Sequence, residues 1–130
     1  MTIVEQLARY IAARLGLPFE GGNASGAVFF GSMPDAPAKA ICVSAGDLRD
    51  AGDPGGTLAQ VDIRSDLDGA WPLRQAARLM RLLDGQRDVI FMPEGYYVHR
   101  IEAERGFEYA GAGQNNTQYH TARFRIYYCE

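Results

Sequence analysis

The first fifteen residues carry apolar side chains at the spacing of one face of an α-helix. Thr2 and Glu5 have the spacing of a capping box, in which two side chains satisfy backbone N–H groups of the first turn. Gly16 suits the left-handed conformation that ends a helix, and Pro18 prevents continuation. The pattern predicts an N-terminal helix whose buried stripe consists of Val4, Leu7, Ala8, Ile11 and Leu15.

A second helical pattern lies in the middle of the chain. The aspartates within residues 66–68 are a helix start signal, and Pro72 fits the first turn, where its missing N–H has no partner to lose. Gly85 is the stop. We expect the arginines of this helix to lie largely off its buried stripe, which consists of Leu73, Ala76, Ala77, Met80 and Leu83.

Residues 57–65 alternate between apolar and largely polar side chains, which is the pattern of a strand with one buried face. Residues 46–56 and 106–117 are too rich in Gly, Asn and Asp for a regular element, and prolines mark residues 31–38 as a turn or connector. The other apolar runs predict strands at residues 27–30, 39–45, 88–92, 96–104 and 119–128.

The predicted order of elements is α-β-β-β-α-β-β-β. Two helices packed on a mainly antiparallel sheet make a two-layer α+β domain. The length of 130 residues, with 47% apolar and 22% charged residues, is that of one ordinary globular domain. The sequence therefore predicts a single domain over residues 1–130, with enough core to fold without a disulfide or a metal.

Charge argues against a nucleic-acid ligand, because such proteins usually carry a basic surplus. The formal net charge is −3, and Lys39 is the only lysine. The N-terminal stretch has charges within its apolar pattern, unlike a signal peptide, and no apolar run reaches the roughly 18 residues of a membrane span. We therefore expect no membrane partner, no sequence-specific nucleic-acid partner, and a cytoplasm-like compartment.

The sequence has two cysteines and two histidines as candidate catalytic nucleophiles and bases. Cys42 and Cys129 both lie in apolar, strand-like surroundings, so buried free thiols are expected, although the sequence leaves a disulfide between them open. His99 and His120 fall inside predicted strands with no nucleophile motif beside them. Each is interpreted as a strand histidine with a local hydrogen bond.

Acidic and glycine-rich clusters give no complete site. Asp62, Asp66 and Asp68 offer oxygen ligands for a hard cation, but the spacing of a calcium loop is missing and Asp68 is better explained by the helix start. The glycine-rich stretches 21–26 and 111–116 match no phosphate-binding motif. The sequence predicts no catalytic, cofactor or metal site, and a protein that is not an enzyme.

A succession of spaced segments resembles a known family. FFGSMPDAPAKAICV is followed by GDLRDAGDPGG, by TLAQVDIRSD, by a helix ending in LLDG, and finally by QYHTARFRIYY. This succession is similar to the small minor capsid or tail-terminator (tail completion) proteins of tailed bacteriophages, over nearly the whole chain. The most distinctive positions of the resemblance are Met33, Pro34, Asp35 and Pro37, followed by Gln60, Val61, Ile63 and Arg64.

The resemblance implies a virion structural protein that is made in the cytoplasm of a bacterial host. Proteins of this kind form a ring, typically a hexamer, at the head-proximal end of the tail tube. The ring ends polymerisation of the tube and joins the tail to the head connector. The implied partners are other copies of the chain, the tail tube protein and the connector or neck proteins.

The last predicted strand is the candidate assembly interface. It contains no proline or glycine that would block pairing at a sheet edge, and one of its faces is polar and bears a tyrosine. The candidate interface residues are Thr121, Arg123, Arg125 and Tyr127. Two loops, expected to become ordered on docking, supply Asp47, Arg49, Asp50 and Asp53, and Gln114, Asn115 and Asn116.

Two alternatives stay open at the level of sequence. The first is a head-side neck or head-completion protein, which would also act by assembly. The second is a small cytosolic ligand-binding domain or enzyme of unrecognised type, in which acidic loop residues and His99 or His120 would line a pocket.

Overall fold

The computed structural model describes residues 1–21, 25–46, 56–66 and 69–129. In these residues the element order is α-β-β-β-α-β-β-β, as predicted. A 3-10 turn separates the last two strands. The elements are α1 (Ile3–Leu15), β1 (Ala27–Phe30), β2 (Ala40–Ala45), β3 (Thr57–Ser65), α2 (Ala70–Leu83), β4 (Arg87–Ile90), β5 (Tyr97–Ala112), η2 (Gln114–Asn116) and β6 (Gln118–Cys129).

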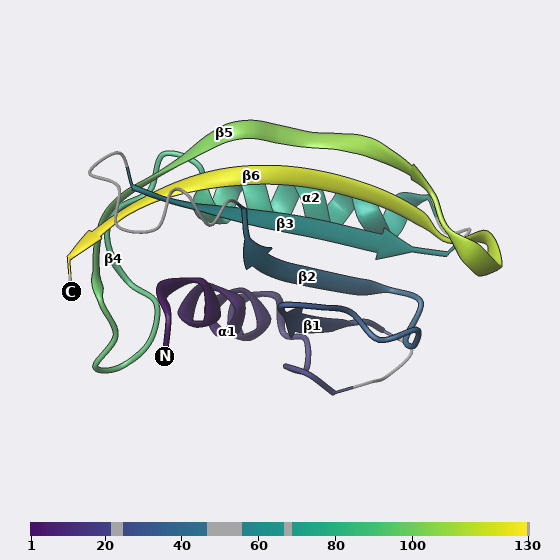
Figure 1. The fold of residues 1–130 in the computed structure, drawn as a ribbon, viewed down its shortest axis with the longest axis horizontal. Helices are drawn as coiled ribbons and strands as arrows, with labels where there is room; N and C mark the ends of the chain where they lie inside the picture. Colours follow the sequence, from purple (N-terminus) through teal and green to yellow (C-terminus); the bar gives the residue numbers. More distant parts are fainter. Residues whose placement is uncertain (22–24, 47–55, 67–68, 130) are drawn as a thin grey trace.

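The strands described form one six-stranded sheet in the order β1-β2-β3-β6-β5-β4. The β1–β2 pair is parallel and every other neighbouring pair is antiparallel, so the expected mainly antiparallel α+β fold is confirmed. β5 and β6 are long, curved neighbours that form a hairpin across the molecule (Figure 1). Because β6 pairs with β3 on its other side, it is an interior strand, and the prediction that it offers a sheet edge is wrong.

The two helices cover the same face of the sheet. α1 packs on β1 and β2, whereas α2 packs on β3 and β5. Leu7 of α1, Leu79 of α2 and Phe124 of β6 belong to one core cluster and have no exposed surface. Arg78 of α2 also donates a hydrogen bond from Nη2 to the carbonyl oxygen of Leu15, at 3.4 Å, so the helices are neighbours.

The first helix follows its sequence signals closely. The side chain of Thr2 accepts a hydrogen bond from the backbone N–H of Glu5 at 3.1 Å. Gly16 ends the helix with a φ of 69°, a left-handed conformation that glycine adopts at little cost. The predicted buried stripe of this helix is confirmed, from Val4 to Leu15.

The second helix is rotated relative to the prediction. It begins at Ala70, after Gly69 as the N-cap, and its side chain at position 73 is 64% exposed instead of buried. The buried positions include Trp71, Gln75, Leu79 and Leu83, an i, i+4 series that contains a polar residue. The side chain of Gln75 accepts a hydrogen bond from Arg78. A polar residue can therefore occupy a buried position that the apolar pattern does not predict.

β5 extends far beyond its predicted end. The sequence predicts an irregular segment at residues 106–117, yet the strand continues to Ala112. The register with β6 shifts at four places along its length, which is how β-bulges absorb extra residues while pairing continues. Gly111, with a φ of 117°, lies at the last of these shifts. No helix within the described residues is both long and apolar enough to cross a bilayer.

Candidate functional site

The sheet has a second face that the helices do not cover. The register brings side chains of β3, β6 and β5 into transverse rows on this face: Gln60 lies beside Arg123, which lies beside Arg105. We define the polar face as Gln60, Asp62, Arg100, Glu102, Arg105, Glu108, Thr121, Arg123, Arg125 and Tyr127. All four candidate interface residues of the last strand therefore lie together on one surface.

Most charges of the polar face are paired. Arg125 contacts the Glu104 carboxylate through Nε at 2.8 Å and through Nη2 at 2.7 Å. Arg100 lies 3.4 Å from Glu102 and places its guanidinium 4.2 Å from the centre of the Tyr127 ring. These contacts hold long side chains in place over the strands, which reduces the side-chain conformational entropy that is lost when a partner binds.

Arg123 is different from its neighbours. It is exposed, and in the described part of the chain it has no carboxylate partner. Its cross-strand neighbour Arg105 contacts Glu108 only at 3.9 Å, with both of these side chains more than 60% exposed. The centre of the polar face thus presents two adjacent guanidinium groups, and only one of them has a weak carboxylate contact.

The two most distinctive sequence motifs meet at one edge of this face. Arg64, only 5% exposed, donates from Nη2 to the carbonyl oxygens of Pro34 and Pro37 at 2.6 and 2.7 Å. Its Nε donates to the carbonyl oxygen of Ala38 at 3.2 Å. Met33 packs on a small cluster formed by Ala27, Phe29 and Ala40. Residues 31–38 therefore cover the side of β1 and β2 that faces away from the helices, and one buried arginine ties them to β3.

Of the candidate docking residues, the structure describes only those at the tip of the β5–β6 hairpin. Asp47, Arg49, Asp50 and Asp53 lie outside the described residues. Gln114, Asn115 and Asn116 form the exposed turn at the tip of the β5–β6 hairpin. The carbonyl oxygen of Gln114 accepts hydrogen bonds from the N–H and the hydroxyl of Thr117, at 3.2 and 2.7 Å, so this turn is hydrogen-bonded in the isolated subunit.

Both cysteines are free thiols in different surroundings. Cys42 is buried on β2, and its burial, together with the Asp62 carboxylate and against the opposing effect of Arg64, raises its pKa from 9.0 to about 11. Cys129 is exposed, so the expectation that it is buried is wrong. It ends β6, and its Sγ lies 2.8 Å from Nε2 of His99.

The remaining candidates for chemistry do not form a metal site within the described part of the chain. His120 meets the ring edge of Tyr109 at 5.6 Å, and its buried Nδ1 has no hydrogen-bond partner in the structure. The side chain of Gln60 donates to both carboxylate oxygens of Asp62, while Asp68 lies outside the described residues. Among the residues that the structure places, no group of three His, Cys, Asp or Glu side chains is arranged to hold a metal ion.

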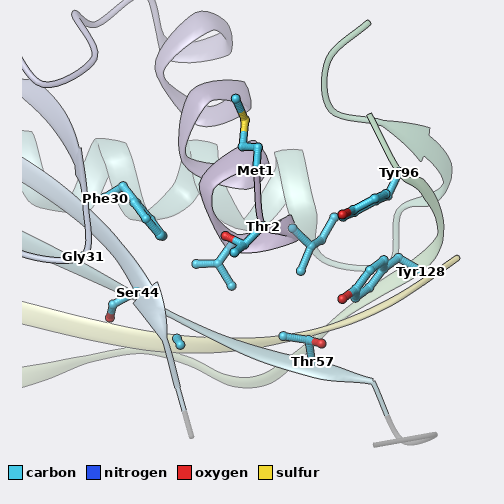
Figure 2. A pocket seen from close by; sticks show the side chains of 11 residues that line it. Met1, Thr2, Phe30, Gly31, Ser44, Thr57, Tyr96 and Tyr128 are labelled. Carbon is cyan, nitrogen blue, oxygen red and sulfur yellow. The ribbon is translucent and has the colours of Figure 1, made fainter. Parts of the chain in front are cut away.

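A pocket of about 690 Å³ lies at the start of α1 (Figure 2). Its walls come from segments far apart in the sequence, which explains why no sequence pattern indicates it. Tyr96 and Tyr128 form one wall with their rings stacked at 5.3 Å. Among the described residues the lining is Met1, Thr2, Ile3, Val4, Phe30, Gly31, Ser44, Ala45, Thr57, Tyr96 and Tyr128, a set that includes neither histidine and no acidic residue.

Comparisons with known proteins show the fold. No protein-family model and no curated protein matches the chain. A solved structure matches the fold: a chain in the structure described as "Virion of native gene transfer agent (GTA) particle" superposes on this protein with a TM-score of 0.59. The two chains are 17% identical, and the alignment covers 98% of each. The whole α+β fold, rather than a part of it, is thus shared with a component of a virion.

Proposed function

We propose that this protein is a structural component of a virion and acts by assembly, without catalysis. The observation that carries the proposal is the match, over 98% of both chains, to a chain of a virion particle. A fold alone does not determine function, so the match gains weight from a second feature. That feature is a broad sheet face that helices leave uncovered and that carries polar and tyrosine side chains suited to a protein partner.

The finer form of the proposal is a tail terminator. Copies of the chain would close into a ring of six at the head-proximal end of a tail tube, end its polymerisation and contact the head connector. Two sequence motifs support this choice over other virion roles. The proline connector and the Arg64 strand, which carry the resemblance to tail terminators, form one interlocked unit in the structure.

The polar face is the proposed contact between copies. Because β6 is an interior strand, the contact uses side chains rather than strand addition. Arg123 and Arg105 would receive carboxylates of the neighbouring copy, while Tyr127 and Arg100 supply a flat, pre-ordered contact area. One such heterologous contact, repeated with a constant rotation, closes a ring.

The test is charge reversal at Arg123. Arg125 is less suitable because its substitution would also break the ion pair with Glu104. Arg123→Glu should leave the melting temperature within a few degrees and abolish rings in negative-stain images of concentrated protein or of protein with tail tubes. The matched control is Arg74→Glu, an exposed arginine of α2, which lies on the opposite side of the sheet. Rings that form equally well with Arg123→Glu would overturn the polar face as the interface.

A second experiment separates the tail from the head. Particles that lack the protein should show overlong tubes and unjoined tails if it is a tail terminator. Filled or leaking heads with tails of normal length would instead favour the head-side neck alternative. Normal particles in its absence would count against any assembly role.

A further inference from the structure

Four side chains with potential chemistry gather at the end of the β5–β6 pair. Tyr97 is the register partner of Cys129, and His99 is the next outward residue of β5. Asp88 of the neighbouring strand β4 lies against Tyr97, whose hydroxyl donates a hydrogen bond to Oδ1 of the aspartate. The cluster joins three strands, although Cys129 and His99 lie 30 positions apart in the sequence.

The geometry of the pair is that of a thiol and its base. Sγ of Cys129 lies 2.8 Å from Nε2 of His99, within reach for direct proton transfer. The Tyr97 ring meets the imidazole edge-on at 5.0 Å and 79°, which restricts its rotation. The hydrogen bond to Asp88 raises the pKa of Tyr97, so the phenol stays protonated and keeps that ring in place.

The other cysteine of the chain, Cys42, is an internal control that should not react in the folded protein. Cys42 is buried, and its raised pKa, about 11, keeps it a thiol at neutral pH. A thiolate is the nucleophile in sulfur exchange, and it must also be reached by its reaction partner. Of the two cysteines, only Cys129 is exposed to solvent and adjacent to a base.

We propose that Cys129 is a modification site for low-molecular-weight disulfides of the glutathione class, with His99 as its proton acceptor. Nε2 of His99 takes the proton from the thiol, and Sγ attacks one sulfur of the disulfide. The S–S bond of the small molecule breaks, and its second half leaves as a thiolate that recovers the proton from the imidazolium. The products are a mixed disulfide on Cys129 and one free small thiol, so no further oxidant is needed. This inference does not depend on the proposed assembly role.

The experiment treats the full chain with glutathione disulfide and follows the intact mass and the modified peptide over time. One adduct should form, on the peptide that contains Cys129, and Cys129→Ser should abolish it. Cys42 should stay unmodified in the folded protein and react only after denaturation. An adduct on Cys42 in the folded protein, or none on Cys129, would overturn the proposal.

The role of His99 is tested by rate. His99→Gln should slow adduct formation at pH 7 on the order of tenfold or more, because the thiol then loses its base. At a pH well above 9, where an exposed thiol is ionised without help, the two proteins should react at similar rates. Among the described residues, the charged and titratable neighbours of the pair include Asp88 on β4, and Tyr97 and Arg100 on β5. Equal rates at pH 7, or an equal deficit at both pH values, would show that His99 does not accept the proton.

Discussion

The two faces of the sheet are made by alternate residues of the same strands, yet they differ in burial and in charge. On the helix-covered face, Val61, Phe124 and Ile126 have no exposed surface. One residue away on the polar face, Arg123 is exposed and Arg125 is held by an ion pair. The difference teaches that a strand with period-2 alternation separates two tasks: one set of positions stabilises the fold, and the other is available for a partner.

The largest expected effect is on the covered face. Phe124→Ala removes a fully buried ring that contacts Phe107 edge-on, with 6.2 Å between the ring centres, and should lower the free energy of unfolding by about 3–5 kcal/mol. Urea titration followed by the fluorescence of Trp71, the single tryptophan, measures it. Its neighbour offers the contrast: Arg123→Ala should change the same quantity by less than about 0.5 kcal/mol. Similar losses for both would contradict the division between the faces.

The next effect concerns a place where the non-helical face is itself buried, under residues 31–38. Arg64→Lys replaces a guanidinium that reaches three carbonyl oxygens with an ammonium that lacks this fork. The free energy of unfolding should fall by about 1.5–3 kcal/mol, because charge-assisted hydrogen bonds are lost from a buried site. Arg123→Lys is the exposed control and should be neutral. A neutral Arg64→Lys would mean that residues 31–38 hold their place without the arginine.

A smaller effect depends on pH. The pKa of Cys42 is raised in the folded protein, so the unfolded chain loses this proton first as the pH rises. Its contribution to stability is fully present below pH 9 and is lost as the pH rises from 9.0 to about 11. Melting temperatures of the wild type and of Cys42→Ala should therefore differ by a constant amount up to pH 9 and converge above it or change order. Parallel curves through pH 11 would contradict the burial of this thiol.

The smallest effect is at an ion pair of the polar side. Glu104→Gln removes the carboxylate that Arg125 contacts, but both side chains are partly exposed, so the change in unfolding free energy should stay below about 1 kcal/mol. The change should shrink further in high salt, because solvent ions screen such pairs. A loss of several kcal/mol, measured by the same urea titration, would show that the polar side contributes more to folding than the comparison implies.

The sequence predicts regular elements well where one rule governs a segment. Strand β3 has the predicted bounds because its alternation is uninterrupted, and α1 has them because both ends carry capping residues. The glycine content after residue 104 predicts too early an end for β5, whereas bulges let the strand accommodate residues such as Gly106 and Gly111. For α2 the apolar pattern predicts a different buried face, because a polar residue, Gln75, occupies a buried position and accepts a hydrogen bond from Arg78.

The candidate sites depend more strongly on tertiary structure. The alternation of β6 was sufficient to assign Thr121, Arg123, Arg125 and Tyr127 to one face, but not to show that the strand is internal, since that depends on which strand it pairs with. The contact between His99 and Cys129 follows from the hairpin register, and the predicted turn was too long to give that register. The pocket at the start of α1 is lined by six separate segments, so no local pattern reveals it.

The hydrogen bonds of Arg64 have a consequence for how this fold diverges. The arginine is recognised by three main-chain oxygens, which residues of any type can present. Side chains at positions 34, 35, 36 and 38 are therefore free to change over evolutionary time, provided that the backbone path is kept, while position 64 is not. We expect lineages of this fold to retain an arginine at the equivalent strand position long after the connector has become unrecognisable. This single arginine would then be the most durable marker for aligning distant relatives.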